Sequence, residues 1–123
     1  MEKKNDNRHR GTKGEKTAAK ELIKKGYEIL DMNYCRKGGE IDIIAKKDEI
    51  IVFAEVKLRK SGSMASPCEA VDIKKQKRII ETAKKYIDEK NLYEGTFRFD
   101  VIELLEDNGR LYMKHIENAF WES

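Results

Sequence analysis

The strongest constraint on the fold is a pair of neighbouring apolar runs that stay hydrophobic at consecutive positions. One run is IDIIA at 41–45, and the other is IIVFAEV at 50–56. Strands that are apolar on both faces are typical of the centre of a sheet that is covered on both sides. The sequence therefore predicts two central strands, at 40–46 and 50–58.

The other strands follow from shorter alternating patterns. YEILDMNY, TFRFDVIEL and RLYMKHI predict strands at 27–34, 96–104 and 110–116. Asn108-Gly109 between the last two predicts a tight hairpin turn.

Two amphipathic helices complete the pattern. Apolar residues at helical spacing predict a helix over 12–25 and another that ends near Lys90. The second helix has two candidate starts, because Ser66–Glu69 has capping-box spacing and Asp72 is also a good cap. The order α-β-β-β-α-β-β predicts an α/β fold with a central mixed β-sheet flanked by helices.

The chain of 123 residues suits one domain, which we expect to span 11–123 after a flexible polar segment at 1–10. Nothing resembles a transmembrane stretch or a signal peptide, so we expect a cytoplasmic protein without a membrane partner. Cys35 and Cys68 lack metal-site spacing and are expected to be reduced. Two isolated histidines exclude a histidine-based metal site.

Basic residues outnumber acidic ones in 1–20 and 57–90, whereas acids prevail in 21–56 and 91–123. Such clustering suits a polyanion partner, although solvated helix faces have the same composition. The aromatic residues show no platform of the kind that single-strand binders use.

Charged residues interrupt the two apolar strands. Asp42 lies in the first strand, and Glu55 and Lys57 lie on one face of the second. If the turn centres on Lys47-Asp48, Asp42 lies opposite Phe53 and Glu40 opposite Glu55, all on one side of the sheet. A slip of one residue would put the two sets of acids on opposite faces.

Two carboxylates on one face can converge on one cation. Oxygen ligands without histidine or cysteine favour Mg²⁺ or Mn²⁺. A solvated edge with Lys57 neutralising the acids is the alternative, but the apolar flanks favour a buried site.

Each helix adds one polar residue on its expected core face. Glu15 precedes Ala18, Ala19 and Leu22 on the first helix. Gln76 falls in the stripe of the second helix, whose apolar members are Ile73, Ile80, Ala83 and Ile87. Both residues could reach the sheet site, although ordinary polarity at a helix end explains each of them equally well.

These residues match a known pattern. Asp42 followed by Glu55-x-Lys57 resembles the signature of the PD-(D/E)XK nucleases, a superfamily with a restriction endonuclease-like fold. A wider ordered set is present in GxxGExxAxxxLxxxGY (Gly11 to Tyr27), GGEIDIIA, FAEVKLR, EAVDIKKQKRI and RFDVI. This set resembles the YraN-like family of small bacterial proteins, which is similar to archaeal Holliday junction resolvases.

The resemblance implies a role for each matching position. Asp42 and Glu55 would bind the metal with Glu15 in support, Lys57 would be the catalytic lysine, and Gln76 a polar helix residue facing the site. The first acid lacks the preceding proline of the nominal motif and follows Ile41 instead. The implied function is hydrolysis of phosphodiester bonds in nucleic acid, with DNA, including branched DNA, as substrate and a homodimer as the working form.

Further residues complete this expectation. The backbone carbonyl of Val56 is a candidate ligand, and Glu40 is either an extra ligand or a residue at the rim. The candidates for binding phosphates are Arg59, Lys60, Lys74, Lys75, Lys77 and Arg78. Two alternatives stay open, namely a non-catalytic nucleic-acid-binding module and a protein-interaction domain on the same fold.

Overall fold

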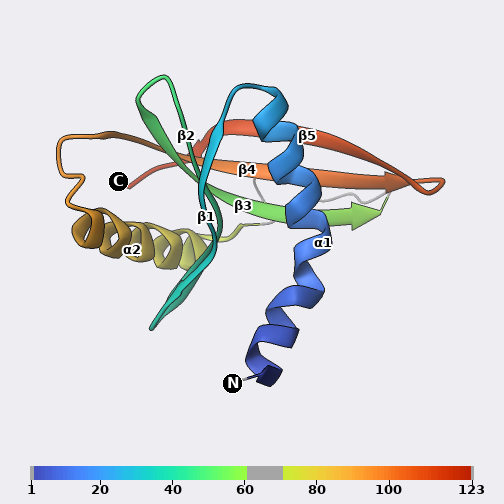
Figure 1. Cartoon of the computed structure of the whole chain (residues 1–123), viewed down its shortest axis with the longest axis horizontal. Helices are drawn as coiled ribbons and strands as arrows, with labels where there is room; N and C mark the ends of the chain where they lie inside the picture. The colour runs from blue at the N-terminus through green and yellow to red at the C-terminus, as the bar shows by residue number, and fades with distance from the viewer. Residues whose placement is uncertain (1, 61–70, 123) are drawn as a thin grey trace.

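A five-stranded sheet with one helix on each face forms the fold (Figure 1). The computed structural model describes residues 2–60 and 71–122, and the side chains of 1–12 and of residue 60 lie outside this description. The elements are α1 (Glu2–Lys24), β1 (Glu28–Arg36), β2 (Gly39–Lys47), β3 (Ile50–Lys60), α2 (Ile73–Lys90), β4 (Thr96–Asp107) and β5 (Arg110–Phe120). The predicted α/β class and order α-β-β-β-α-β-β are confirmed.

The strands lie in the order β1-β2-β3-β4-β5, so β3 is the central strand. Neighbouring strands are antiparallel except β3 and β4, which are parallel and joined through α2. A parallel pair needs such a crossover because its second strand must start again at the same end of the sheet.

α1 begins at Glu2, well before the predicted start at residue 12. The predicted flexibility of residues 1–10 stays a prediction, because their side chains lie outside the description. α2 begins after Asp72, whose side chain accepts a hydrogen bond from the backbone N–H of Lys75. This confirms the later of the two candidate caps, and the capping box at Ser66–Glu69 lies outside the described residues.

The sheet is covered on both faces, as the apolar runs predict. On one face α1 contributes Ala18, Ala19 and Leu22 to a core over β2, β3 and β4. On the other face α2 packs over Ile44 and Phe53. Its buried stripe consists of Ile79, Ile80, Thr82, Ala83 and Tyr86. Among the described residues, no helix is long and apolar enough to cross a membrane.

The turn between β2 and β3 corrects the predicted register. Lys47 pairs with Ile50, and Ile44 lies opposite Phe53, so the predicted turn centre at Lys47-Asp48 and the predicted opposition of Asp42 and Phe53 are wrong. Asp48 and Glu49 form the turn, and both have the positive φ angles (50° and 67°) that a type I′ hairpin needs.

The error is two residues, and a shift of two preserves the face of every side chain. The predicted opposition of Glu40 and Glu55 is therefore wrong as well, while the placement of Asp42 and Glu55 on one side is unaffected. The β2–β3 ladder ends at Ile43 and Ala54. Asp42 and Glu55 are the next residues on their strands.

A buried carboxylate on β4, that of Asp100, contacts residues of β5. The turn at Asn108-Gly109 is confirmed, with φ angles of 53° and 78°. The register then shifts next to Asp100, which is fully buried. Asp100 accepts hydrogen bonds from Arg98 and from the backbone N–H of Asn118, and its Oδ2 lies 2.7 Å from His115 Nε2.

Candidate active site

An open pocket of about 910 Å³ lies where β2 and β3 part beyond their last paired residues. We call it the acidic pocket. Its lining comes from α1, β1, the β1–β2 turn, β2, β3 and α2. The residues are Glu15, Cys35, Arg36, Gly38, Gly39, Glu40, Asp42, Glu55, Val56, Lys57, Lys75, Arg78 and Ile79. The structure therefore brings most of the predicted site residues to one place.

Asp42 and Glu55 form the buried floor of this pocket, with 7% and 4% of their surfaces exposed. Asp42 Oδ2 accepts a hydrogen bond of 2.8 Å from the backbone N–H of Val56. This bond joins β2 to β3 just beyond the end of the backbone ladder. The carboxylate of Asp42 is therefore fixed in position by the strand that carries Glu55.

Glu55 is held by two lysines from different elements. Its Oε2 lies 2.5 Å from the ammonium of Lys75 on α2 and 3.5 Å from that of Lys57 on β3. Burial tends to lower the pKa of Lys75, but the contacts with Glu55 outweigh this effect and raise it above its ordinary value. Lys75 therefore stays charged, and it compensates one of the two buried carboxylates.

Asp42, unlike Glu55, is not compensated by a lysine within ion-pair distance among the described residues. Burial and the nearby charge of Glu55 raise its pKa to about 8, although the hydrogen bond from Val56 opposes the shift. The pKa of Glu15 on α1 is also raised, mainly by burial, against hydrogen bonds with Asn33 and Asp42 that lower it. At neutral pH the acidic pocket thus retains a proton on Asp42 when no cation is bound.

The donor set suits a hard, hydrated cation. Among the described residues, no three carboxylate, imidazole or thiolate groups are arranged to hold a metal ion by themselves. Mg²⁺ typically uses one or two protein carboxylates and keeps several of its waters, so Asp42 and Glu55 satisfy that requirement. In addition, Glu15 Oε1 is buried and lacks a hydrogen-bond donor within the described part of the chain.

Glu40 is exposed at the mouth of the pocket. Its negative charge is one of the influences that raise the pKa of Glu15, whereas it does not lie opposite Glu55. The sequence leaves open whether Glu40 is an extra metal ligand or a residue at the rim, and its exposed position is that of a rim residue.

Gln76 is not brought to the acidic pocket. Its side-chain N–H₂ donates to the backbone carbonyl of Val71 at 2.8 Å, and the residue lines a different hollow. The predicted stripe is confirmed for Ile80, Ala83 and Ile87, but it is wrong at its first turn, where Ile73 is 62% exposed. One turn before the buried Ile79 is Lys75, which occupies the place that the sequence gives to Gln76.

The residues predicted to bind phosphates differ in their exposure and in their ion pairs. Lys74, Lys77 and Arg78 are exposed on the first turns of α2, and Arg78 lines the acidic pocket. Arg59 instead forms an ion pair with buried Glu103 and has only 14% of its side chain exposed. The side chain of Lys60 lies outside the described residues.

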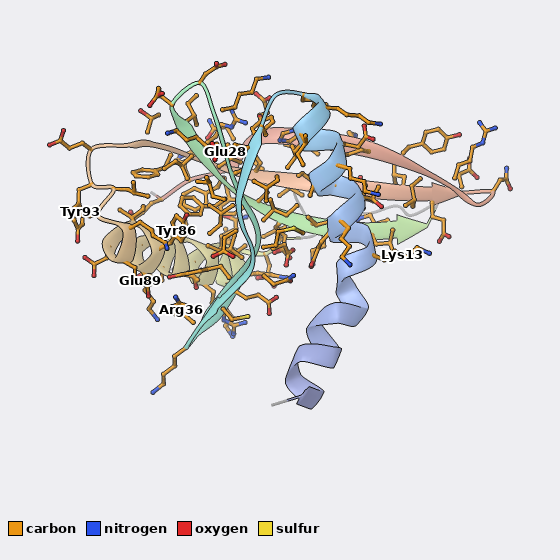
Figure 2. All side chains as sticks on the ribbon, in the orientation of Figure 1. Lys13, Glu28, Arg36, Tyr86, Glu89 and Tyr93 are labelled. Carbon is orange, nitrogen blue, oxygen red and sulfur yellow. The ribbon has the colours of Figure 1, made fainter. Side chains whose placement is uncertain are left out.

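Arg36 is a pocket residue that the sequence analysis missed. It makes two hydrogen bonds of 2.8 Å with Glu89 of α2, and the two side chains meet beside the β1–β2 turn in Figure 2. The signal for this arrangement was Gly39, the first residue of β2, which pairs with Arg36 across the turn. A Cβ at Gly39 would lie 2.3 Å from Thr82 Oγ1, so the turn packs directly on α2 and carries Arg36 with it.

Relatives of this chain occur in several bacteria. The profile of the uncharacterised protein family UPF0102 matches residues 14–104. A UPF0102 protein from Clostridioides difficile is 47% identical over 94% of this chain and 99% of its own length. Similar relatives occur in Clostridium acetobutylicum (47% identical; 93% and 95% covered) and Caldanaerobacter subterraneus (46% identical; 89% and 93% covered). The chain therefore belongs to the UPF0102 family, which is the YraN-like family that its motifs indicate.

Proposed function

We propose that this protein is a metal-dependent nuclease that hydrolyses phosphodiester bonds in nucleic acid, with DNA, including branched DNA, as its substrate. The main support is the buried pair Asp42 and Glu55 at the end of the β2–β3 ladder. Two buried carboxylates in one site are unfavourable unless protons or cations compensate them. The resemblance to PD-(D/E)XK nucleases assigns metal binding to the same two positions.

The residues fit Mg²⁺ or Mn²⁺. Asp42 and Glu55 would bind the ion, and the backbone carbonyl of Val56 is a further candidate ligand. Glu15 would support the site from α1, where its buried Oε1 is an acceptor without a donor among the described residues. Glu40 would contribute charge at the rim. When bound, the ion would polarise the phosphate and lower the pKa of a bound water.

Lys57 and Lys75 would act on the substrate side. Both ammonium groups contact the Glu55 carboxylate and hold it from β3 and from α2. Lys57, whose side chain is 29% exposed, can also orient the attacking water and offset negative charge that develops on the phosphate. Because Lys75 remains charged, Lys57 does not have to neutralise Glu55 alone.

The surroundings of the pocket suit a sugar–phosphate backbone. Arg36 and Arg78 line the pocket, and Lys74 and Lys77 are exposed on the adjoining turns of α2. Contacts of this kind position nucleic acid without reading its sequence. Arg59 would act indirectly, because its partner Glu103 is buried beside it. Lys60 remains a further candidate for contact with phosphates.

The test is cleavage of end-labelled linear, flapped and four-way-branched DNA with Mg²⁺ or Mn²⁺. Asp42→Asn and Lys57→Ala should each reduce the cleavage rate by roughly 10² or more, since each removes a group that acts on the transition state. Asp48→Asn in the β2–β3 turn and Lys46→Ala at the far end of β2 are matched controls outside the acidic pocket, and both variants should cleave normally.

A readout independent of activity is the melting temperature. Mg²⁺ should raise it for the wild type and much less for Asp42→Asn, because only the wild type keeps both carboxylates. Cleavage that is equal in the wild type and in both pocket variants would mean that the acidic pocket does not cut nucleic acid.

A second candidate is a non-catalytic nucleic-acid-binding module. It is favoured by the two lysines that already compensate Glu55, because a self-neutralised carboxylate has less need of a metal. This candidate predicts salt-sensitive DNA binding without turnover, and undiminished function in cells that carry Glu55→Gln. Metal-dependent cleavage that Glu55→Gln abolishes would exclude it.

A further inference from the structure

A hollow of about 330 Å³ lies on α2 beside the end of β5, outside the acidic pocket. Trp121, the only tryptophan of the chain, and Ile73, the first residue of α2, line it with 64% and 62% of their surfaces exposed. Gln76 and Lys77 line the same hollow. Two large apolar side chains that remain exposed in one concave site indicate a ligand-binding surface.

The chemistry of this hollow matches a nucleobase. An indole face offers a stacking surface, and every base has a π-face that can use it. Gln76 keeps its amide oxygen as an acceptor, because its N–H₂ group already donates to Val71. Lys77 adds a positive charge at the edge, where a phosphate attached to such a base would lie.

The acids of the hollow do not oppose this assignment. Glu81 and Glu122 line it on the far side, and both form ion pairs with Lys84, at 3.2 Å and 2.6 Å. Lys84 therefore offsets one of these two negative charges, and Lys77 at the other side of the hollow offsets the second. The side of the hollow that faces the start of α2 carries Lys77.

The hollow and the acidic pocket share no described lining residue, and a third, shallow depression on the exposed face of α2 lies between them. Lys75, which contacts Glu55, directly precedes Gln76 in the chain. Lys77 and Arg78 together line a shallow depression next to Gly38, and Arg78 also lines the acidic pocket. A strand whose phosphate occupies the acidic pocket would reach Trp121 by passing over Arg78 and Lys77 on the exposed face of α2.

We propose that Trp121, Ile73 and Gln76 form a stacking site for one base of a single-stranded segment next to the cut, a site that we call the base site. This inference rests on the proposed function, and it names the form of nucleic acid that the acidic pocket receives. It also revises the expectation that the chain lacks an aromatic platform. The platform is one tryptophan, which the fold places beside the basic turns of α2.

The single tryptophan provides the test. Wild-type protein in EDTA is titrated with a labelled oligothymidylate of roughly 12 nucleotides and with an abasic oligomer of the same length. Anisotropy reports binding, and tryptophan fluorescence reports stacking. We expect the oligothymidylate to quench the fluorescence and to bind more tightly, and the abasic oligomer to bind through its phosphates with little quenching.

Variants separate stacking from general binding. Trp121→Ala should weaken oligothymidylate binding about tenfold, and it should leave the affinity for the abasic oligomer unchanged. Tyr93→Ala is the matched control, because Tyr93 is also 62% exposed but lies outside the base site. It should behave as the wild type with both oligomers.

Two results would overturn the proposal in distinguishable ways. If oligothymidylate binds the wild type without quenching, and equally well to Trp121→Ala, the base site is wrong while the proposed nuclease function stands. If neither these oligomers nor duplex DNA bind at low salt, the base site and the proposed function both fail.

Discussion

At the scale of single residues, the acidic pocket depends on a carboxyl group held in an unfavourable place. Asp42 is buried beside Glu55 and has a pKa of about 8. Glu55 is compensated by two lysines, whereas no ion pair to Asp42 is present among the described residues. The metal-free protein therefore carries a local destabilisation that a cation would relieve.

This arrangement predicts a pH-dependent stability. Because folding raises the pKa of Asp42 from 3.8 to about 8, the folded state binds the proton more tightly than the unfolded state. The contribution of Asp42 is unchanged below the unfolded pKa, and it becomes increasingly destabilising as the pH rises from about 4 to 8. Asp42→Asn, which has no charge to bury, should stabilise the metal-free protein by about 2 kcal/mol at pH 8.

Urea unfolding of metal-free wild type and Asp42→Asn, at pH 5 and pH 8, measures this difference. Asp48→Asn is the control, since Asn also adopts the positive φ angle of that turn position. A gain in Asp42→Asn that is the same at pH 5 and pH 8 would exclude titration of this carboxyl group as its cause.

At the scale of elements, β4 and β5 are joined by a buried carboxylate. Asp100 holds the irregular part of the β4–β5 pair through Arg98, His115 and the backbone of Asn118. Burial by itself would raise the pKa of Asp100, but these hydrogen bonds and the Arg98 charge outweigh it and lower the pKa. The carboxylate form is thus the form that stabilises the fold.

Asp100→Asn should destabilise the protein by roughly 3 kcal/mol at pH 7, because it leaves the half-buried Arg98 without its nearer charged partner and, of the described residues, only Glu117 at 3.7 Å remains. The stabilisation from Asp100 is present above the unfolded pKa and is lost as the pH falls through the lower folded pKa. Denaturant unfolding from pH 7 to pH 3 should therefore bring the wild type closer to the variant. Exposed Glu106→Gln on the same strand is the control, and a constant difference between wild type and Asp100→Asn across this range would contradict the prediction.

A second prediction concerns the close packing of the β1–β2 turn on α2. Gly39→Ala would place a Cβ 2.3 Å from Thr82 Oγ1 and 3.2 Å from the carbonyl of Arg78. Overpacking at such a site should lower stability by about 1–3 kcal/mol and displace the turn that carries Arg36. Thermal unfolding measures the loss, and the added substitution Thr82→Ala should recover part of it. No recovery in the double variant would mean that the hydroxyl is not the obstacle.

At the scale of the whole molecule, the basic surface encloses the acidic pocket from α2 and from the β1–β2 turn. If nucleic acid binds there, Arg78→Gln should weaken binding to all sequences alike and reduce the slope of log affinity against log salt by about one. Lys90→Gln, at the opposite end of α2, should leave the slope unchanged. Fluorescence anisotropy at several salt concentrations measures both slopes, and equal slopes for wild type and Arg78→Gln would remove Arg78 from the interface.

The fold was predictable from the sequence because its signals are local. Apolar residues on both faces indicated β2 and β3 as covered strands, and Asp72 and Asn108-Gly109 indicated a helix start and a hairpin turn. The β2–β3 register was not predictable, because Asp48-Glu49 lacks the glycine that usually marks a type I′ turn. The error of two residues spared the site, since side chains alternate with a period of two.

The candidate site was only partly predictable. Asp42, Glu55 and Lys57 were identifiable because they interrupt apolar strands. Lys75 and Gln76 were confused, because the exposed Ile73 extended the predicted stripe toward Gln76, whereas packing buries Ile79 and brings Lys75, one turn earlier, to the pocket. The contribution of Arg36 depends on where the β1–β2 turn meets α2, which is a long-range contact.

The hydrogen bond from Val56 to Asp42 has a spectroscopic consequence. A backbone amide in the middle of a sheet normally reports only on its own ladder, yet this one donates to a carboxylate whose charge changes near pH 8. The amide proton resonance of Val56 should therefore move as Asp42 loses its proton, and again when a cation displaces that proton. One backbone signal can thus follow the state of the pocket without any substrate.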